Sequence, residues 1–338
     1  MRWTSPPTAR QHPVSAMQSS SYLIDLNARL AEGVTKLPAE LRSRHATYLL
    51  TSQNADGGFS GREGGSDLYY TGFALRGLAV LDALTPEVCR RASKFLVGRL
   101  NDQVSVVDFF SLLYSCFLVG MAGEDVLAGS APDWPERVAA ALESFRTPDG
   151  GYAKAVAGSS GSVYHTFLVV LSYELLGKPI PAGTEIVRFV HGRQRDDGGF
   201  VEIAPMKRSG TNPTAAAIGT LQILSAGNPS ALPPTIRTTA ADFLAAMAAP
   251  EGGLRGNSRA PVADLLSTFT GLWTLAQLNG VAAIDGVATC RFALAVEMPT
   301  GGFRGGLWDE RADVEYTFYG LGCLGLLADL QGFSSHAP

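Results

Sequence analysis

A short corner sequence occurs five times in this chain, and it restricts the fold more than any other feature. Two glycines stand before an apolar residue, and an acidic residue usually precedes them, as in ADGGF, PDGGY, DDGGF, PEGGL and PTGGF. The first glycine of each pair falls at 57, 150, 198, 252 and 301, so the intervals are 93, 48, 54 and 49 residues. A near-constant period of this length indicates stacked supersecondary units that bury a shared core.

The sequence pattern of each unit predicts two helices joined by the corner. Residues 37–53 before the first corner are amphipathic, whereas residues 67–84 after it are more uniformly apolar. Residues 86–121 have the same two-part pattern without a Gly-Gly pair, so they count as a sixth unit that has lost it. The amphipathic helices are expected to face solvent, and the apolar helices are expected to form an inner ring.

We therefore predict an all-α fold, an α/α toroid (α6/α6 barrel) of six helical hairpins with a central cavity. Residues 21–338 are expected to form this single domain, and the Ser- and Pro-rich segment 1–20 is expected to be disordered. Glycine adopts positive φ at no steric cost, so the Gly-Gly pairs are assigned to turning the chain and not to chemistry.

Composition argues against several classes of protein. The formal net charge is −4 and no block of Lys and Arg occurs, so no nucleic-acid partner is predicted. No run of 18 or more apolar residues occurs, so no transmembrane segment is predicted. The cysteines lie far apart, which indicates a reduced, cytoplasmic chain without a Cys-based metal site. They are Cys89, Cys116, Cys290 and Cys323.

The segments around the corners resemble a known superfamily. Residues 44–59 (RHATYLLTSQNADGGF), 161–178 and 301–327 are similar to the repeats of squalene-hopene and related terpene cyclases. They are equally similar to the repeats in the β subunits of protein prenyltransferases. The resemblance covers about residues 37–332. It implies an α/α toroid and an isoprenoid small-molecule substrate, and the superfamily includes transferases, cyclases and non-catalytic relatives.

The resemblance to prenyltransferase β subunits implies a zinc site that this chain does not complete. Those subunits bind zinc through an Asp, a Cys two residues later and a His in the sixth hairpin, and the zinc activates a substrate thiol. Asp264 matches the Asp, but Leu266 stands at the Cys position and Tyr316 at the His position. Leucine has no atom that binds a metal, so we predict no metal site.

The resemblance to terpene cyclases implies a proton donor at the start of the last inner helix. Residues 313–317 (DVEYT) resemble the Asp-rich motif whose buried carboxylic acid protonates an alkene or epoxide. Glu315 takes the donor position with Asp313 as its helper, and its side chain is expected to point into the cavity. The alternative is that Asp313 caps the helix and Glu315 stabilises the first turn.

Aromatic residues gather just after the corners on the predicted inner helices. Aromatic faces stabilise carbocations and also pack long polyenes, although ordinary core packing explains any single one of these residues. His165 lies among them, either as a substrate contact or as a hydrogen-bonded core residue. The candidate substrate-binding residues are Tyr69, Tyr164, His165, Phe269, Trp273, Tyr316 and Tyr319, with Tyr70, Phe73, Phe167 and Phe318 beside them.

A diphosphate substrate would need cations near the cavity mouth. In prenyltransferase β subunits an Arg and a Lys follow the fifth corner, and Arg255 and Arg259 lie in that segment here. Guanidinium groups suit phosphate oxygens, so both arginines are candidate substrate-binding residues. The alternative is that they are surface residues. No cofactor is predicted, apart from the Mg²⁺ that a diphosphate would bring.

The leading hypothesis is a zinc-independent, terpene-cyclase-like enzyme that acts on an isoprenoid or isoprenoid diphosphate in an aromatic cavity. One alternative is a prenyltransferase that transfers a prenyl group to an acceptor. The other is a non-catalytic toroid that binds a lipid or a protein. A deep aromatic cavity would favour the first hypothesis over the last, because a binding scaffold has no need for one.

Overall fold

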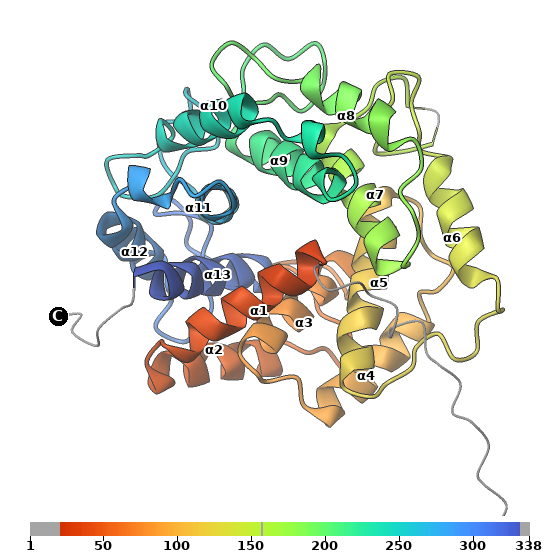
Figure 1. The fold of residues 1–338 in the computed structure, drawn as a ribbon. Helices are drawn as coiled ribbons and strands as arrows, with labels where there is room; N and C mark the ends of the chain where they lie inside the picture. The colour runs from red at the N-terminus through yellow and green to blue at the C-terminus, as the bar shows by residue number, and fades with distance from the viewer. Residues whose placement is uncertain (1–20, 157, 332–338) are drawn as a thin grey trace, which may run out of the picture.

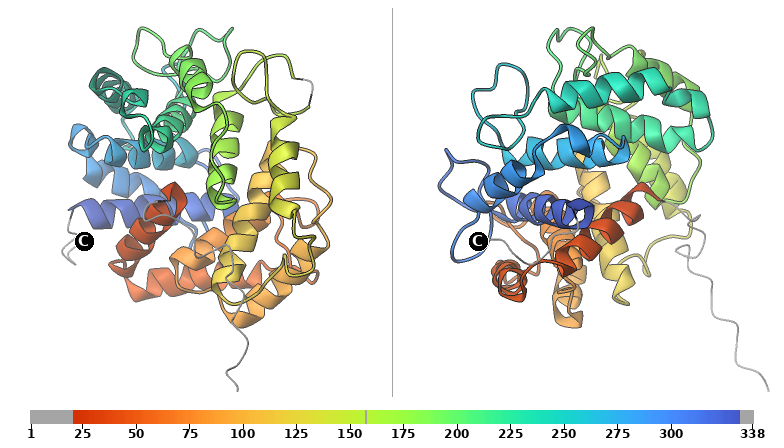
Figure 2. Two further views of the ribbon diagram at one scale, coloured as in Figure 1. Left: turned by 45° about the vertical axis from the view of Figure 1, so that its right-hand side comes forward. Right: turned by 60° about the vertical axis from the view of Figure 1, so that its left-hand side comes forward.

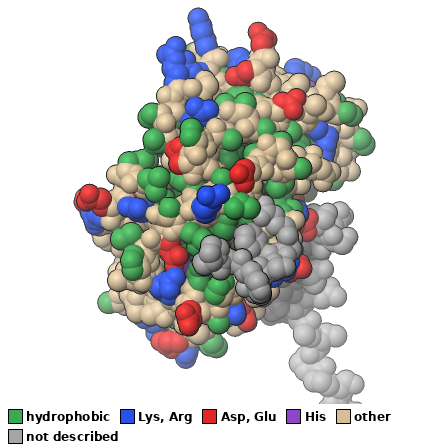
Figure 3. All heavy atoms as spheres, turned by 90° about the vertical axis from the view of Figure 1, so that its left-hand side faces the viewer, with side chains coloured by type: hydrophobic (Ala, Val, Ile, Leu, Met, Phe, Trp, Pro, Cys, Tyr) green, Lys and Arg blue, Asp and Glu red, His purple; other side chains and the backbone are tan. Residues whose placement is uncertain are grey.

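The computed structural model describes residues 21–156 and 158–331, which form thirteen α-helices, two short 3₁₀ helices (Pro229–Ala231 and Val281–Ala283) and isolated β-bridges (Figure 1). No β-strand occurs in these residues, so the chain is all-α as predicted. The predicted disorder of residues 1–20 lies outside the described residues. No helix among the described residues has the length and hydrophobicity of a membrane span. On the face that Figure 3 shows, hydrophobic side chains are interspersed with charged ones.

Twelve of the helices form six hairpins, and each hairpin places one helix outside and one inside. The outer helices are α2 (Ala39–Thr51), α4 (Pro86–Val97), α6 (Trp134–Glu143), α8 (Gly183–His191), α10 (Pro234–Ala245) and α12 (Gly286–Ala295). The inner helices are α3 (Leu68–Val80), α5 (Val106–Met121), α7 (Val163–Leu175), α9 (Thr211–Ser225), α11 (Leu265–Gln277) and α13 (Val314–Gln331). The sequence prediction of six hairpins is therefore confirmed, including the unit without Gly-Gly.

The inner helices pack side by side in chain order, and α13 packs against α3, so the ring closes (Figure 1). Hydrophobic patterning explains which helix lies inside. The inner helix α3 buries nine of its thirteen residues, whereas α2, the outer helix of the same hairpin, buries three of thirteen. A helix that is apolar on nearly every face must be covered on every face, and only the inner ring provides that environment.

The five Gly-Gly corners share one hydrogen-bond pattern. In each corner the backbone N–H of the apolar residue donates to a threonine hydroxyl in the second turn of the following inner helix. Phe59 N donates to Thr71 Oγ1 at 2.9 Å, and Phe303 N donates to Thr317 Oγ1 at 3.2 Å. The other three pairs are Tyr152 with Thr166, Phe200 with Thr214 and Leu254 with Thr268. The corner is thereby fixed to the helix that it introduces.

The glycines of each corner face the outer helix of the next hairpin around the ring. Gly57 has a φ of +92°, and a Cβ on it would lie 2.0 Å from the carbonyl oxygen of Arg91 in α4. Gly58 lies beneath the ring of Phe95, where a Cβ would be 2.9 Å from two ring carbons. The same arrangement occurs at the other four corners. The Gly-Gly pair is therefore a joint between neighbouring hairpins, as well as a turn.

The second hairpin has no Gly-Gly pair, and its neighbour α6 is packed differently. Phe145, just after α6, meets the ring of Phe109 in α5 edge-on at a centroid distance of 6.2 Å. Within α6 only Leu142 is buried. A side-chain contact thus replaces the backbone joint, and the outer helix beside it has the fewest buried residues of the six.

Polar contacts between the first and sixth hairpins reinforce the closure of the ring. Arg62, in the loop after the first corner, forms ion pairs with Asp309 and Asp313 at 2.5 and 2.9 Å. The buried ring of His45 accepts a hydrogen bond from the backbone of Gly302 at 3.0 Å and stacks on Phe303. These contacts join segments about 250 residues apart in the chain.

The remaining helix, α1 (Tyr22–Thr35), belongs to no hairpin. It lies along α13 and also contacts α3 (Figure 2). Its apolar face is buried through Leu23, Leu26 and Leu30. The N-terminal end of α1 thereby reaches the space inside the ring.

Candidate active site

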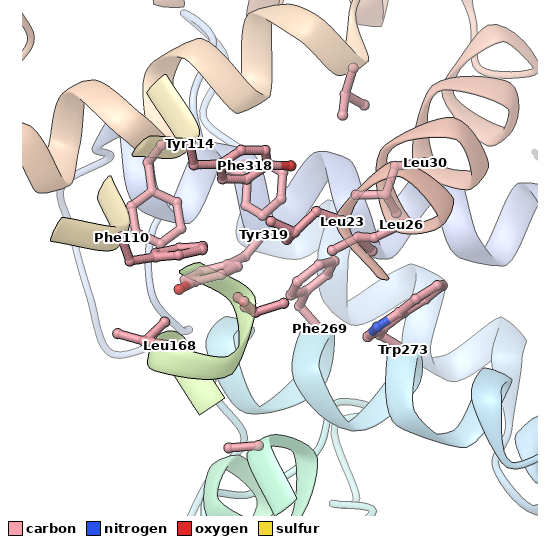
Figure 4. Close-up of a cluster of buried hydrophobic side chains, with 14 of the residues drawn as sticks. Leu23, Leu26, Leu30, Phe110, Tyr114, Leu168, Phe269, Trp273, Phe318 and Tyr319 are labelled. Carbon is pink, nitrogen blue, oxygen red and sulfur yellow. The ribbon is translucent and has the colours of Figure 1, made fainter. Parts of the chain in front are cut away.

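A central cavity of about 560 Å³ lies inside the inner ring. Figure 4 shows Phe269, Phe318 and Tyr319 in one cluster of side chains, and the ring centroid of Phe269 lies 5.4 Å from that of each of the other two. This volume is typical of small-molecule sites, and the lining favours an apolar ligand. The aromatic lining residues are Tyr22, Tyr69, Phe73, Phe110, Tyr114, Tyr164, Phe167, Phe269, Trp273, Phe318 and Tyr319.

Helix α1 separates this cavity from a smaller pocket at the C-terminal ends of the inner helices. Trp273 Nε1 donates a hydrogen bond to Tyr22 Oη at 2.7 Å, and both residues line both spaces. The second pocket has about 370 Å³ and is polar, with Asp25 and Glu174 in its wall. Burial raises the pKa of the Glu174 carboxyl to about 7. Tyr22 and Trp273 therefore form the floor of the aromatic cavity.

Glu315 lies at the opposite end, between the cavity and a depression in the rim. Its side chain lines the rim depression and not the cavity, which corrects the expectation that it would point directly inwards. Its Oε1 accepts hydrogen bonds from the hydroxyls of Tyr69 at 2.7 Å and Tyr319 at 3.4 Å. Both tyrosines line the cavity, so a phenol stands between the carboxyl group and the cavity interior.

Burial raises the pKa of Glu315 above its usual value, against the effect of the Tyr69 hydrogen bond, and the negative charge of Asp313 raises it further. Asp313 itself caps α13, because its Oδ1 accepts the backbone N–H of Tyr316 at 2.9 Å. Its other carboxylate oxygen, Oδ2, accepts a hydrogen bond from Arg62 Nε at 2.9 Å. The capping interpretation therefore describes the geometry of Asp313, whereas Glu315 makes no cap.

The candidate substrate contacts fall into three groups. Tyr69, Tyr164, His165, Phe269, Trp273 and Tyr319 line the central cavity. Tyr316 lines the rim depression, where the guanidinium of Arg62 lies 5.6 Å from its ring centroid. Arg255 and Arg259 line neither space, so their assignment to a phosphate-binding mouth stays a prediction. The Arg255 guanidinium donates instead to the Met247 and Ala246 carbonyls at the end of α10, and Arg259 is exposed.

His165 belongs to a chain of hydrogen bonds in the cavity wall. The Ser162 hydroxyl donates to the Glu202 carboxylate and lies 2.7 Å from His165 Nδ1. Because the serine proton points to Glu202, His165 Nδ1 must donate its own proton to Ser162, and His165 Nε2 remains as an acceptor. Burial, aided by the charge of Lys154, lowers the pKa of His165 to about 4, so the imidazole is neutral near pH 7.

The residues at the zinc positions of prenyltransferase β subunits do not fit a metal ion. Both carboxylate oxygens of Asp264 bond to Ser267, one to its backbone N–H at 2.7 Å and one to its hydroxyl at 2.8 Å. Leu266 offers no ligand atom, and burial raises the pKa of the Tyr316 hydroxyl to about 12. In residues 21–156 and 158–331, no group of three His, Cys, Asp or Glu side chains is placed to bind a metal.

Sequence reasoning missed several residues of the cavity. Arg76 on α3 and Ser111 on α5 line it, together with Glu202 and the α1 residues Tyr22, Leu23 and Leu26. Helical spacing carried a signal for Arg76, because it lies seven residues after Tyr69 and therefore on the same face of the predicted inner helix. Nothing in the repeat pointed to α1, which precedes the first hairpin.

The sequence matches the profile of the prenyltransferase alpha-alpha toroid domain over residues 35–98, 90–231 and 215–337. The chain belongs to this family. The matched ranges cover all six hairpins and begin at the end of α1, so the family repeat accounts for the ring but not for α1, which supplies Tyr22 to the cavity floor. A search of curated protein sequences gives no significant match.

Solved structures of this fold come from proteins with different activities. Protein geranylgeranyltransferase-I of Candida albicans, complexed with GGPP, has a TM-score of 0.66 at 14% identity, covering 85% of this chain and 91% of that one. A single-substitution variant of the type II terpene cyclase MstE of Scytonema, in complex with geranylgeranyl dihydroxybenzoate, has a TM-score of 0.58 at 14% identity, covering 90% and 98%. An α-1,6-mannanase from a Salegentibacter species has a TM-score of 0.59 at 12% identity, covering 86% and 98%. At these identities the likeness shows the toroid fold alone.

Proposed function

We propose that this protein is a zinc-independent isoprenoid-processing enzyme that starts a cyclisation by protonating its substrate. The observation that carries the proposal is the position of Glu315. Glu315 is a half-buried carboxyl with a raised pKa, and it accepts a hydrogen bond from the phenol of Tyr69 in the aromatic cavity wall. A raised pKa increases the fraction of the carboxyl that holds a proton near neutral pH, which a general acid requires. Two toroids of the same fold have isoprenoid ligands, which supports an isoprenoid here.

The geometry suggests a concerted proton relay in which the Tyr69 hydroxyl lies between Glu315 and the substrate. Protonated Glu315 gives its proton to Tyr69 Oη while the Tyr69 hydroxyl proton passes to the terminal carbon–carbon double bond of the substrate. The π electrons form the new C–H bond, and a carbocation remains on the more substituted carbon. The surrounding aromatic faces stabilise this cation, and Glu315 is left as the carboxylate that accepts the Tyr69 hydrogen bond.

The cation must later lose a proton, and His165 is placed to accept it. Its Nε2 is the free acceptor of a neutral imidazole, and the residue lines the cavity. A carbocation is acidic enough that an imidazole with a lowered pKa still serves as a base. Transfer of this proton to Nε2 forms the product alkene and an imidazolium that Glu202 stabilises through Ser162.

One observation favours a second candidate, a toroid that binds a lipid without transforming it. Glu315 lines the rim and not the cavity, so direct contact with a buried substrate is missing. A third candidate, prenyl transfer to an acceptor, would release diphosphate, whereas a cyclisation started by protonation retains it. Measurement of diphosphate release separates these two chemistries.

The test is turnover of C15 and C20 isoprenoids, supplied as alcohols, acids, diphosphates and prenylated benzoates, with product analysis by gas chromatography and mass spectrometry. Glu315→Gln and Tyr69→Phe are expected to lower turnover at least about a hundredfold, which is the typical contribution of a positioned acid. Glu310→Gln changes an exposed acid in the same rim segment and is expected to retain full activity.

In D₂O the cyclised product is expected to gain one deuterium at the protonated carbon. Saturable binding with no product from any of these compounds would favour the binding toroid. Full activity of Glu315→Gln would remove Glu315 as the acid, and stoichiometric diphosphate release would favour transfer.

A further inference from the structure

The wall of the central cavity contains a cation, Arg76 on α3. Its guanidinium carbon lies 4.1 Å from the centroid of the Phe73 ring and 5.2 Å from that of Tyr114. The rings of Phe318 and Phe110 lie 5.5 and 5.7 Å away. Aromatic faces attract a guanidinium group, so these four rings partly compensate for its removal from water. They provide no negative charge.

Most of the hydrogen-bonding capacity of Arg76 is unused within residues 21–156 and 158–331. Nε donates to the carbonyl of Gly72 at 3.1 Å, but the two terminal nitrogens have no acceptor and no carboxylate lies within ion-pair distance. Ser111 on the facing helix α5 also lines the cavity, and its hydroxyl has no partner in the described chain. A Cβ on Gly72 would lie 3.4 Å from Arg76 Nη2, 3.5 Å from Ser115 Oγ and 3.8 Å from Ser111 Cβ, so all three side chains lie beside this glycine.

Among the described residues that line the cavity, Arg76 is the single cation and the Glu202 carboxylate is the single anion. Glu202 already accepts hydrogen bonds from Ser162 and from the Tyr164 backbone, and His165 is neutral near pH 7. Two arginines line the rim depression: Arg62 pairs with Asp309 and Asp313, and the more exposed Arg311 lies 3.6 Å from Glu63. A diphosphate carries two or more negative charges and needs several cations around it, whereas one guanidinium fork matches one carboxylate.

We infer that Arg76 and Ser111 form an anion-binding subsite within the central cavity, and that the substrate is an isoprenoid bearing a single carboxylate. This inference rests on the proposed function, because it takes the cavity to hold an isoprenoid chain. The carboxylate accepts two parallel hydrogen bonds from the Arg76 fork and one from the Ser111 hydroxyl. The hydrocarbon chain lies against the aromatic rings, with its far end towards Tyr69.

The carboxylate also has a consequence for the chemistry. A carbocation that forms near an uncompensated guanidinium is destabilised by charge repulsion in a medium of low dielectric constant. A substrate carboxylate bound to Arg76 cancels that charge before the cation forms. A neutral alcohol of the same length is therefore expected to bind in the cavity but to react more slowly than the acid.

The experiment compares the binding of farnesoic acid, farnesol and farnesyl diphosphate by isothermal titration calorimetry in Mg²⁺-free and Mg²⁺-containing buffer. Glu315→Gln serves as the background, because it is expected to bind ligands without turning them over. The acid is expected to bind at least about tenfold more tightly than the alcohol or the diphosphate. In Arg76→Met this preference is expected to vanish while the alcohol binds as before, and Arg76→Lys is expected to keep only part of it. Arg137→Met, an exposed arginine on α6, is the matched control and is expected to keep the full preference.

Equal binding of acid and alcohol to the Arg76-containing protein would overturn the inference, as would tightest binding of the diphosphate or an unchanged preference in Arg76→Met. A melting temperature of Arg76→Met at or above that of the parent shows that lost binding is not lost folding. If the preference for the acid depends on Arg76 but protein with Glu315 intact forms no product, the anion-binding subsite is supported and the proposed enzymatic function is rejected. If product forms from the alcohol and Arg76→Met leaves its rate unchanged, the enzyme stands and the subsite fails.

Discussion

The corners and the cavity wall are two regions built from the same six hairpins, but only the corners repeat. Five corners share a Gly-Gly joint to the next outer helix and a threonine hydroxyl that fixes the apolar residue. The wall instead differs from hairpin to hairpin, with Arg76 on α3, His165 on α7 and the Tyr69–Glu315 contact between α3 and α13. The repeated positions therefore carry the architecture, and the candidate chemistry lies at positions that break the repeat.

The comparison has an internal control in the second hairpin, which lacks the joint. The outer helix that should receive it, α6, has one buried residue, whereas α4 beside the first corner has six. Loss of the glycines thus coincides with looser packing of one outer helix, and the inner ring still closes. Changes in the corner region should alter stability and leave ligand binding intact, and changes in the wall should do the reverse.

The largest effect is expected from Gly57→Ala. The alanine Cβ would overlap the carbonyl of Arg91 in α4, and the positive φ would add strain. Together these should lower the free energy of unfolding by about 2–5 kcal/mol, measured by urea denaturation. Gly123→Ala is the matched control, because its φ of +91° is nearly the same but nothing lies within 4 Å of the new Cβ. The free energy of unfolding of Gly123→Ala should fall by only about 1–2 kcal/mol. Equal losses in the two variants would show that backbone strain, and not a joint between hairpins, explains the corner glycine.

A smaller effect is expected from Arg62→Met. This change leaves the buried carboxylates of Asp309 and Asp313 without their cation where the first and sixth hairpins meet. The free energy of unfolding should fall by about 2–3 kcal/mol, because an unpaired buried charge is costly. Arg137→Met on the exposed face of α6 should change it by less than about 0.5 kcal/mol. A similar small change for Arg62→Met would mean that apolar packing of α13 on α3 closes the ring alone.

The missing joint should also appear in the unmodified protein. Backbone amides of α6 are expected to exchange with deuterium faster than those of α4 or α12, with a local opening free energy lower by about 1–2 kcal/mol. Hydrogen exchange followed by mass spectrometry of peptides covering each outer helix measures this difference. Equal protection of α6 and α4 would show that the Phe109–Phe145 contact fully replaces the glycine joint.

The smallest change in stability is expected from Tyr319→Phe in the wall. Removing this hydroxyl should alter the free energy of unfolding by less than about 0.5 kcal/mol. Its hydrogen bond favours the ionised form of Glu315, so its loss should raise the pKa of Glu315 further. A general acid works only while protonated, so activity is present below this pKa and lost as the pH rises through it. The alkaline limb of the rate profile should therefore move to higher pH, and a shift to lower pH would contradict the role of Glu315.

The repeat allowed the fold to be predicted from the sequence. The interval of 93 residues located the hairpin without glycines, and the contrast between amphipathic and apolar runs separated outer from inner helices. The same reasoning placed Tyr69, Tyr164 and Phe269 on the cavity wall, because a residue just after a corner must lie near the start of an inner helix.

The sequence did not predict where individual polar side chains point. Arg255 follows a corner, but its guanidinium turns back to the carbonyls that end α10, which local sequence does not encode. Glu315 was found, although the phenol between it and the cavity comes from a hairpin almost 250 residues earlier. Arg76 was overlooked because it lies more than two turns into α3, past the segment in which the aromatic residues cluster.

The position of α1 has a consequence for how cavities of this kind can diversify. The depth of the cavity is set by Tyr22 and Trp273, and one of these two residues lies on a helix outside the family repeat. Smaller side chains at the start of α1 would join the aromatic cavity to the polar pocket beneath it, without disturbing any hairpin contact. The length of chain that the cavity accepts can thus change through a single appended helix, while the ring around it stays the same.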